Sequence, residues 1–367
     1  MTTAPPPPAP PPPAPPPPAP PPTVPPPTVP PPTVPPPTVR TVLGDVSPDG
    51  LGICDSHDHI FFRSPRLPAD EALDDAAAAT AELRAFAGLG GGTVVQWTPF
   101  GLGRGSARLA GVSRAAGVHL VAATGLHQAA HYPPDLVRRV KEDGLAALFV
   151  RELTEGLSDL PVGARPEGAT AGVPVRAGMI KVAGTFHALD AHARTVMTAA
   201  ATAHHATGAP IGVHLEHGTA GADVLDLLCE ELSVPPESVL LGHLNRFPEP
   251  RVHRELAERG AYLCFDGPSP ANQATDWRLL DALTALVGAG HAGQLLLGGD
   301  TTTARARAAT GGGPGIPYLL RRLGPSLRRE LGPEAAERLL VGNPARAFAV
   351  RWAASPTGRA GSVSAAR

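Results

Sequence analysis

Residues 178–184 read Gly178-Met179-Ile180-Lys181-Val182-Ala183-Gly184, an apolar run of strand length with a lysine at its centre. Lys181 and Lys141 are the only lysines among the 31 basic residues, so arginine supplies nearly all the positive charge elsewhere. A guanidinium keeps its proton in proteins, whereas a buried lysine can become a neutral, nucleophilic amine. Such an amine can take up carbon dioxide to form a carbamate, whose two oxygens can bridge two metal ions. The alternative is a lysine that reaches solvent or a charged partner at a strand end.

Seven other apolar runs of strand length accompany this one, and amphipathic segments separate them. This alternation is typical of a parallel sheet, and eight units predict an α/β fold closed into a (β/α)8 TIM barrel. An open doubly wound sheet is the alternative, but its usual glycine-rich turn is replaced by Ser56-His57-Asp58-His59. The predicted strands are Leu51–Asp55, Thr93–Trp97, Val118–Thr124, Gly178–Val182, Pro210–Leu215, Val239–Leu244, Ala261–Asp266 and Gln294–Asp300. The predicted helices lie at roughly 70–88, 104–116, 134–148, 189–207, 221–232, 249–259, 276–290 and 317–331.

The predicted barrel spans residues 40–353, and the segments on either side differ from it in composition. Residues 5–39 repeat a proline-rich unit of five residues, first Pro-Pro-Pro-Pro-Ala and then Pro-Pro-Pro-Thr-Val. Because proline fixes φ and has no N–H donor, this tract can adopt only an extended polyproline II conformation. We therefore expect residues 1–39 to be a disordered, dispensable arm and residues 354–367 to be a disordered tail. The functional alternative for the arm is a linker or a ligand for a proline-binding domain.

Composition excludes several classes of function. The net charge is −2 and no basic stripe is present, so we expect no nucleic-acid partner. No apolar run reaches the roughly 20 residues that a membrane span requires. Cys54, Cys229 and Cys264 form no Cys-x-x-Cys motif, which favours a reducing, cytoplasmic location and packing roles for Cys54 and Cys264. The expected partner is a small-molecule substrate, and a homodimer is compatible with the sequence.

Six side chains that can bind a metal lie at or just beyond the C-terminal ends of predicted strands. In a barrel those ends face one mouth, where active sites are built. Residues i and i+2 of an extended segment point the same way, so both histidines of the first pair can reach one ion. We read the histidines of loops and helices as surface residues: His187, His192, His204, His205, His253 and His291. The six predicted metal ligands are His57, His59, Lys181, His214, His243 and Asp300.

These residues, and the motifs around them, resemble the phosphotriesterase family of the amidohydrolase superfamily over about residues 40–350. The clearest similarity is Ala177-Gly178-Met179-Ile180-Lys181-Val182-Ala183. Further matching segments are Val39–Gly44, Ser56–Ile60, Gly103-Arg104, Val112–Ala116, Val121–Gly125 and Asn343–Arg346.

The resemblance implies a (β/α)8 barrel with two divalent metal ions, of which zinc suits the nitrogen and oxygen ligands best. It assigns His57, His59 and Asp300 to the more buried ion, and His214 and His243 to the exposed one. It further implies that carboxylated Lys181 and a hydroxide bridge the two ions. Two ions held close together lower the pKa of a bridging water, and Asp300 would accept the proton. Lys181 and Asp300 are therefore the expected catalytic residues of a metal-dependent hydrolase of ester-type bonds.

The residues just outside this set leave the substrate class open. Organophosphate hydrolases of the family carry an Asp and a His where this chain has Arg246 and Gly267. Lactonases of the family carry an aromatic residue and an Arg where this chain has His127 and Gly267. Carboxylic ester, lactone and phosphotriester hydrolysis are thus all retained, with amide or N-acyl hydrolysis as the alternative. A non-catalytic metal-binding barrel is the alternative from another class.

The substrate pocket is expected in the loops that follow the third, sixth, seventh and eighth strands. Glycines in Gly311–Pro317 favour a mobile lid. Arg246 is expected to hold an anionic group of the substrate, or to be paired with Glu249, Glu216 or Asp266 instead. The predicted substrate-binding residues are His127, Arg246, Asp266 and Trp277.

Overall fold

The computed structural model describes residues 1, 4–5, 36–158, 174–269 and 272–352. Contacts divide the chain into two units, residues 1–35 and residues 36–367. Most of the predicted disordered arm and all of the predicted tail at 354–367 lie outside the described residues, so both remain predictions.

The second unit is built around eight parallel strands in the order β10-β9-β8-β7-β6-β5-β4-β3. β3 and β10 meet where the amides of Gly299 and Asp300 both donate to the carbonyl of His57 at 3.0 Å. A Cβ atom at Gly298 would lie 2.4 Å from that oxygen, so glycine permits this close approach. The predicted (β/α)8 barrel is confirmed, and every predicted strand overlaps an observed one. The strands are β3 (Ile53–Asp58), β4 (Gly91–Gln96), β5 (His119–Gly125), β6 (Met179–Ala183), β7 (Ile211–His214), β8 (Val239–Gly242), β9 (Tyr262–Asp266) and β10 (Leu295–Gly298).

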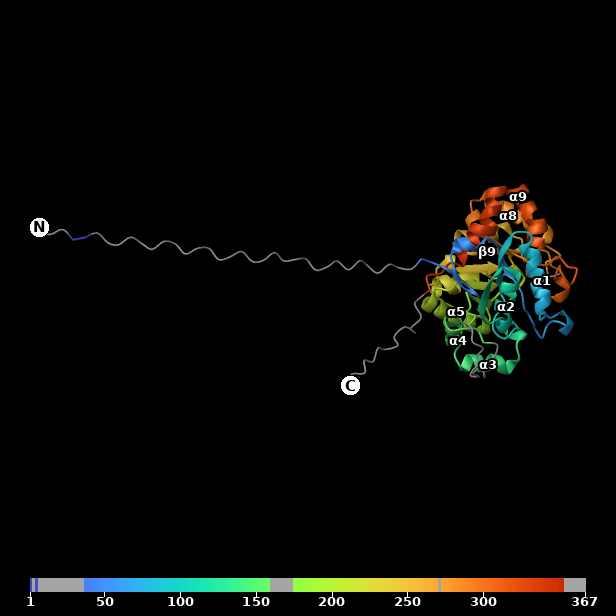
Figure 1. Ribbon diagram of the computed structural model, residues 1–367, viewed down its shortest axis with the longest axis horizontal. Coiled ribbons are helices and arrows are strands. Elements are labelled where there is room, and N and C mark those ends of the chain that lie inside the picture. The colour runs from blue at the N-terminus through green and yellow to red at the C-terminus, as the bar shows by residue number, and fades with distance from the viewer. Residues whose placement is uncertain (2–3, 6–35, 159–173, 270–271, 353–367) are drawn as a thin grey trace. The chain divides into compact units, whose positions relative to one another are not determined.

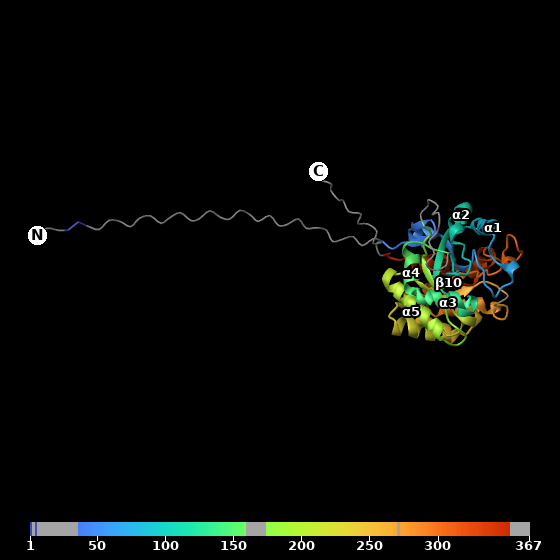
Figure 2. The same cartoon turned by 90° about the horizontal axis from the view of Figure 1, so that it is seen from below.

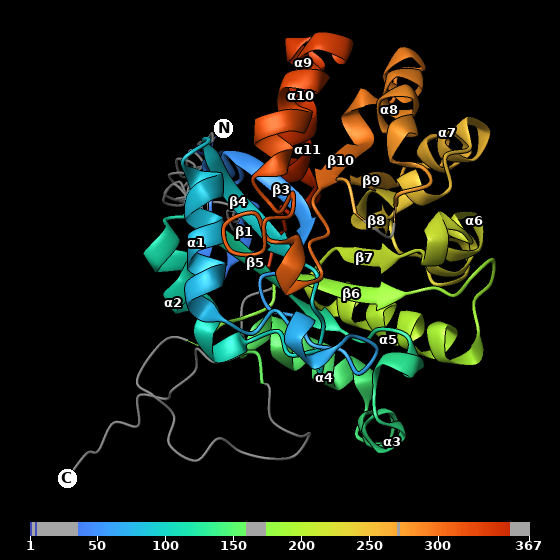
Figure 3. The same ribbon diagram turned by 90° about the vertical axis from the view of Figure 1, so that its right-hand side faces the viewer.

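Helices surround the strands, with α1 and α2 on one side of the view and α6, α7 and α8 on the other (Figure 3). Side-chain caps begin several of them: Asp75 accepts from the amides of Ala77 and Ala78 at the start of α1. The segment predicted as one helix at 134–148 forms two, because Gly144 takes a φ of 94° between them. The helices are α1 (Ala76–Ala87), α2 (Ser106–Ala116), α3 (Pro134–Glu142), α4 (Leu145–Thr154), α5 (Ala191–Thr207), α6 (Gly221–Leu225), α7 (Pro250–Glu258), α8 (Leu279–Gly288), α9 (Gly324–Leu331), α10 (Pro333–Glu337) and α11 (Asn343–Ala347).

Two apolar layers hold this arrangement together. Side chains alternate along each strand: some point outward under the helices, and the others point inward and fill the barrel. Helices α4 and α5 pack side by side on the outside (Figures 1 and 2). Cys54 and Cys264 are fully buried in the inner layer, which confirms their predicted packing role. Among the described residues, no helix is long and apolar enough to cross a lipid bilayer.

The folded unit begins before the predicted boundary at Arg40. Strand β1 (Val39–Thr41) pairs antiparallel with β2 (Gly44–Val46), and Val39 is fully buried in the inner layer. Thr38 exchanges two backbone hydrogen bonds with Val350, of 2.9 and 3.0 Å. The folded unit therefore includes at least two residues before Arg40, because Thr38 bonds Val350 and Val39 begins β1.

Candidate metal centre

The mouth of the barrel brings together all six side chains predicted to bind metal. They come from β3, β6 and β7 and from the residues that directly follow β3, β8 and β10. Five of the six are buried, and His214 is 14% exposed at its side chain. Two sets of three residues could each hold an ion: His57, His59 and Asp300, and His57, His243 and Asp266. The structure thus supports the predicted clustering, while each ligand role stays a prediction.

Nε2 of His57 and Nε2 of His59 both face Asp300. Nδ1 of His59 lies 2.7 Å from Oγ1 of Thr98, which donates its own proton to the carbonyl of Phe61. A neutral His59 therefore donates through Nδ1, and Nε2 is the nitrogen that can bind a cation. Nε2 of His59 and Nε2 of His57 lie 3.4 and 3.7 Å from Oδ1 of Asp300. Two lone pairs and a carboxylate oxygen around one point suit a bound cation.

Asp266 is the residue that orients two of the rings. Its Oδ1 accepts from Nδ1 of His57 at 2.9 Å, and its Oδ2 accepts from Nδ1 of His243 at 2.5 Å. The geometry favours an orienting role for Asp266 over the predicted substrate contact, because this carboxylate is fully buried and both its oxygens are used by the two rings. Carboxylates behind metal-binding histidines fix the ring orientation and tautomer. The position of Asp266 at the end of β9 can be read from the sequence, but its hydrogen-bond partners His57 and His243 cannot.

His214 and His243 form a second opening for a cation. Burial lowers the pKa of His214 to about 4, and the hydrogen bond from His214 lowers the pKa of Glu216 to about 2. Nε2 of a neutral His214 therefore donates to the ionised Glu216, 3.0 Å away, and Gln128 donates to the same oxygen at 2.8 Å. Nδ1 of His214 then faces Nε2 of His243 at 2.7 Å. With no proton between them, these two acceptors suit a shared positive ion.

Lys181 lies in the inner layer of the barrel, 3% exposed. Burial lowers its pKa to about 7, Asp300 and Glu216 oppose this shift, and Arg246 adds to it. Within the described part of the chain its amine has no hydrogen-bond or ion-pair partner. A buried, partnerless amine that is partly neutral near pH 7 fits carboxylation, so the structure supports the first interpretation of Lys181 over a paired lysine.

Trp97 forms the floor beneath these ligands. Its ring lies 4.0 Å from the ring of His57, and its Nε1 donates to the carbonyl of Ser56 at 2.8 Å. Gly212 and Gly242 make room for it, since a Cβ at either position would lie 2.9 or 3.2 Å from the indole. The sequence identifies Trp97 only as the end of a strand, because its packing depends on glycines from two other strands.

Two of the predicted ligands have a left-handed backbone. His243 has a φ of 66° and Asp300 a φ of 51°. Such conformations cost about 1–3 kcal/mol for a non-glycine residue and persist where surrounding contacts impose them. Burial alone would raise the pKa of Asp300, but His243, His59, His57 and Arg246 together lower it, so this side chain stays ionised.

Arg246 is paired with Asp300. Its Nη2 donates to Oδ2 of Asp300 at 2.5 Å, and its Nε donates to Asn272 at 2.7 Å. The expectation that a pairing partner would be Glu249, Glu216 or Asp266 is wrong, because the register of the strands places Asp300 nearest. Nη1 has no hydrogen-bond partner among the described residues, so the predicted contact with a substrate anion rests on this one nitrogen.

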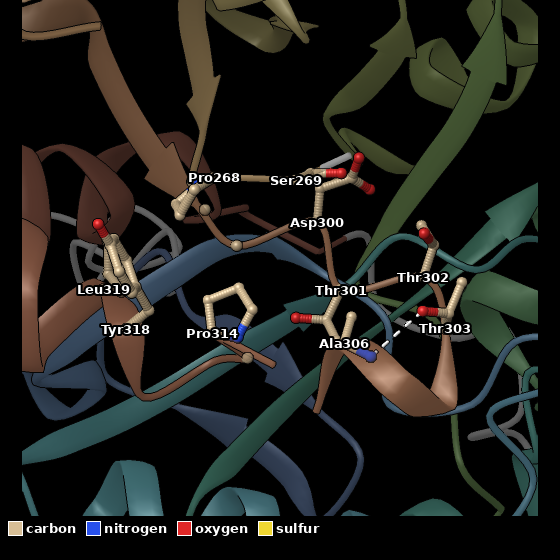
Figure 4. A pocket seen from close by; sticks show the side chains of 14 residues that line it. Pro268, Ser269, Asp300, Thr301, Thr302, Thr303, Ala306, Pro314, Tyr318 and Leu319 are labelled. Atoms are coloured by element: carbon tan, nitrogen blue, oxygen red, sulfur yellow. Dashed lines mark hydrogen bonds between the residues drawn. The ribbon is translucent and has the colours of Figure 1, made fainter. Parts of the chain in front are cut away.

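A cavity of about 210 Å³ opens beside Asp300. Asp300 and Thr303 lie on one side of it, with Tyr318 and Leu319 across from them (Figure 4). Its mixture of hydroxyl groups and apolar side chains fits a small polar substrate. It is formed by the loops after β9 and β10, where part of the substrate pocket was predicted.

The loop after β10 is pinned to α1. The buried carboxylate of Glu82 accepts from the amides of Ala308, Ala309 and Ile316, at 2.8 to 3.1 Å. Nη2 of Arg307 donates to the carbonyl of Ile60 at 2.5 Å. These contacts argue against the mobile lid predicted at Gly311–Pro317, because both ends of the glycine-rich segment are fixed.

His127 and Trp277, the other two predicted substrate-binding residues, occupy different surroundings. The His127 ring is buried, 4.7 Å from His214 and 4.4 Å from His131, and its Nδ1 has no partner. It thus borders the candidate metal centre. Trp277 is 70% exposed, and among the described residues no contact links it to the centre. The histidines expected at the surface include two buried ones, His204 and His253, whose rings bind backbone carbonyls.

Comparison with known proteins agrees with this geometry. A family model described as the phosphotriesterase family matches residues 37–348. A phospho-furanose lactonase of Mycoplasmopsis agalactiae is 30% identical over 328 residues, covering 83% of this chain and 90% of its own.

Solved structures give the same picture. A lactonase from Listeria monocytogenes superposes with a TM-score of 0.75 at 28% identity, covering 85% of this chain and 98% of its own. A phosphotriesterase homology protein from Escherichia coli, complexed with phosphate in its active site, gives a TM-score of 0.73 at 26% identity, covering 82% and 99%.

Proposed function

The chain belongs to the phosphotriesterase family, and from this premise we propose that it hydrolyses a lactone or carboxylic ester at a centre of two divalent metal ions, zinc first. The observation that carries the proposal is the set of histidine nitrogens that gathers with the Asp300 carboxylate at the barrel mouth. Nε2 of His57 and of His59 face Asp300, and Nε2 of His243 faces Nδ1 of His214. A divalent cation in each place would satisfy both groups of ligand atoms.

The residues present fit the implied ions. The inner ion would be held by His57, His59 and Asp300, and the outer ion by His214 and His243. Carboxylated Lys181 would hold both ions. When bound, the ions supply an activated water near neutral pH and polarise the carbonyl that is attacked. Asp266 keeps Nδ1 protonated on His57 and His243, so that Nε2 of each ring stays free.

Asp300 is placed to receive the proton that the attacking water loses. Its Oδ2 accepts from Arg246, and its Oδ1 faces the rings of His57 and His59. Arg246 therefore holds the carboxylate in place, and its free Nη1 can meet an anionic group of the substrate. His127 forms a neutral, buried wall beside His214, since burial holds the pKa of His127 well below its usual value.

Lactone and carboxylic ester rank ahead of phosphotriester for two reasons. The relatives quoted above include proteins named as lactonases. In addition, Arg246 and Gly267 stand where organophosphate hydrolases carry the Asp and His that relay the proton onward.

Hydrolysis of an amide is the second candidate. An N-acetyltaurine hydrolase of Tetraodon nigroviridis is 26% identical over 351 residues, covering 83% of this chain and 96% of its own. The same metal centre could attack an amide carbonyl. Nη1 of Arg246, which has no hydrogen-bond partner among the described residues, could meet the charged group of an anionic N-acyl substrate.

The test is a substrate panel on protein loaded with zinc or manganese, covering lactones, aryl esters, N-acyl amides and phosphotriesters. We expect turnover of lactones or esters that a chelator abolishes and added metal restores. Preferential N-acyl turnover would favour the second candidate. Stoichiometric metal binding without turnover of any substrate in the panel would overturn the proposal in favour of a non-catalytic barrel.

A further inference from the structure

A second pocket, here named the Phe186 pocket, opens beside the metal centre. It is an open groove of about 540 Å³ and is separate from the cavity at Asp300, with which it shares no lining residue. Its walls come from the loops after β6, β7 and β8. The lining residues are Phe186, His187, Glu216, His217, Thr219, Arg246 and Phe247.

We propose that the Phe186 pocket binds an apolar aryl or alkyl group of the substrate, remote from the bond that is cleaved. The inference rests on the proposed function, because it places the reacting bond at the metal centre. Its occupant is therefore part of the same small molecule, and the substrate class becomes an ester or lactone with a hydrocarbon substituent.

Aromatic rings make the rim of this pocket. Phe186 is 60% exposed, although large apolar side chains are normally buried. Its ring meets His187 and His217 edge to face, with centroids 4.4 and 5.6 Å apart, and His187 meets Phe247 at 5.9 Å. Edges and faces of four rings around an open space suit a planar or hydrocarbon group.

The rim is held rigidly. Thr185 and Ala188 close a tight turn with backbone hydrogen bonds of 3.0 and 3.4 Å, and His187 within it has a φ of 52°. The amide of His187 donates to Oγ1 of Thr219 at 2.8 Å, and that hydroxyl donates to the carbonyl of Glu216 at 2.8 Å. Thr219 thus ties the loop after β6 to the loop after β7. An exposed ring on a fixed turn binds a ligand without first losing loop entropy.

Two side chains that line the pocket also contact residues of the metal centre. Glu216 lines the pocket and accepts from Nε2 of His214, and Arg246 lines it and donates to Asp300. Glu216 is further engaged by Gln128 and His217. Since most polar groups at the floor are already paired within the protein, the contribution left for a ligand is mainly apolar contact.

The experiment compares substrates that differ only in their tail. We would measure kcat/KM of the zinc-loaded full chain for γ-butyrolactone and γ-nonalactone, and for phenyl acetate and phenyl octanoate. The wild-type protein should prefer the long-tailed member of each pair that it hydrolyses. Phe186→Ala should lower this long-to-short ratio roughly tenfold, the loss expected for one or two methylene groups left without a partner. Phe186→Leu should retain most of the ratio, because an apolar wall remains.

Leu89→Ala is the matched control, since Leu89 is also an exposed apolar residue, at 39%, and lies after α1 at the start of β4, at the opposite end of the strands. It should leave the ratio unchanged. Calorimetric binding of 4-phenylbutanoate gives a second readout that needs no turnover, and Phe186→Ala should weaken it about tenfold.

The outcomes separate the two proposals. If no lactone or ester is hydrolysed but 4-phenylbutanoate binding depends on Phe186, the proposed reaction fails and the apolar pocket stands. If the long-to-short ratio and the binding of 4-phenylbutanoate are the same in Phe186→Ala as in the wild type, the pocket assignment is overturned while hydrolysis stands.

Discussion

Replacing Asp266 by asparagine should damage the metal centre while removing only one charge. The carboxylate accepts one hydrogen bond from His57 and one from His243, at 2.9 and 2.5 Å. An asparagine offers one acceptor oxygen and an NH2 group, so one of the two rings must face a donor. That ring would have to move its proton to Nε2, where the free lone pair is needed.

The magnitude follows from burial. Asp266 is fully buried, so water cannot replace the lost acceptor. A hydrogen bond to a charged group contributes about 1.5–3 kcal/mol, and we expect the free energy of unfolding to fall by about that amount. Loss of a carboxylate behind a metal-binding histidine typically weakens metal binding about 10–100-fold, or roughly 1.4–2.7 kcal/mol.

The assay is competition for zinc against a chromophoric chelator, together with calorimetric unfolding of the metal-free protein. Asp281→Asn is the control: it makes the same chemical change at a side chain that is 68% exposed, 4.0 Å from Arg278. It should change stability by less than about 0.5 kcal/mol and leave zinc affinity intact. If folded Asp266→Asn bound zinc as tightly as the wild type, the orienting role of Asp266 would be refuted.

Three further predictions address other parts of the molecule. Lys181→Arg should abolish metal-dependent turnover, because a guanidinium cannot be carboxylated. Added short carboxylic acids should restore part of the turnover of Lys181→Ala. Full activity of Lys181→Arg would contradict the carbamate. Arg246→Met should lower kcat/KM for charged and neutral substrates alike, since Arg246 holds Asp300; a loss of 10–100-fold confined to KM of anionic substrates would instead support an anion contact at Nη1. A chain that starts at Pro36 should keep the wild-type Tm and turnover. A chain that starts at Arg40 should unfold at a lower temperature, because it loses buried Val39 and the pairing of Thr38 with Val350. Equal Tm values for the two truncated chains would show that β1 begins at the predicted boundary.

The sequence by itself determined the order of elements and the location of the site. Apolar runs and amphipathic segments are local patterns, so all eight strands could be predicted, with ends that shift by only a few residues, as in β3 at Ile53–Asp58. Placement at strand ends is also local, and it was enough to bring Lys181, His214 and Asp300 to one mouth once a barrel was assumed.

Tertiary structure alone decided which side chains meet there. Asp266 accepts hydrogen bonds from His57 and His243, which belong to two other parts of the barrel. Arg246 donates to Asp300, which is 54 positions away in the sequence. These pairs depend on strand register and on the left-handed backbone at His243 and Asp300. No local propensity encodes the strand register or the left-handed backbone, because the free energy that imposes both comes from packing contacts between segments far apart in the chain.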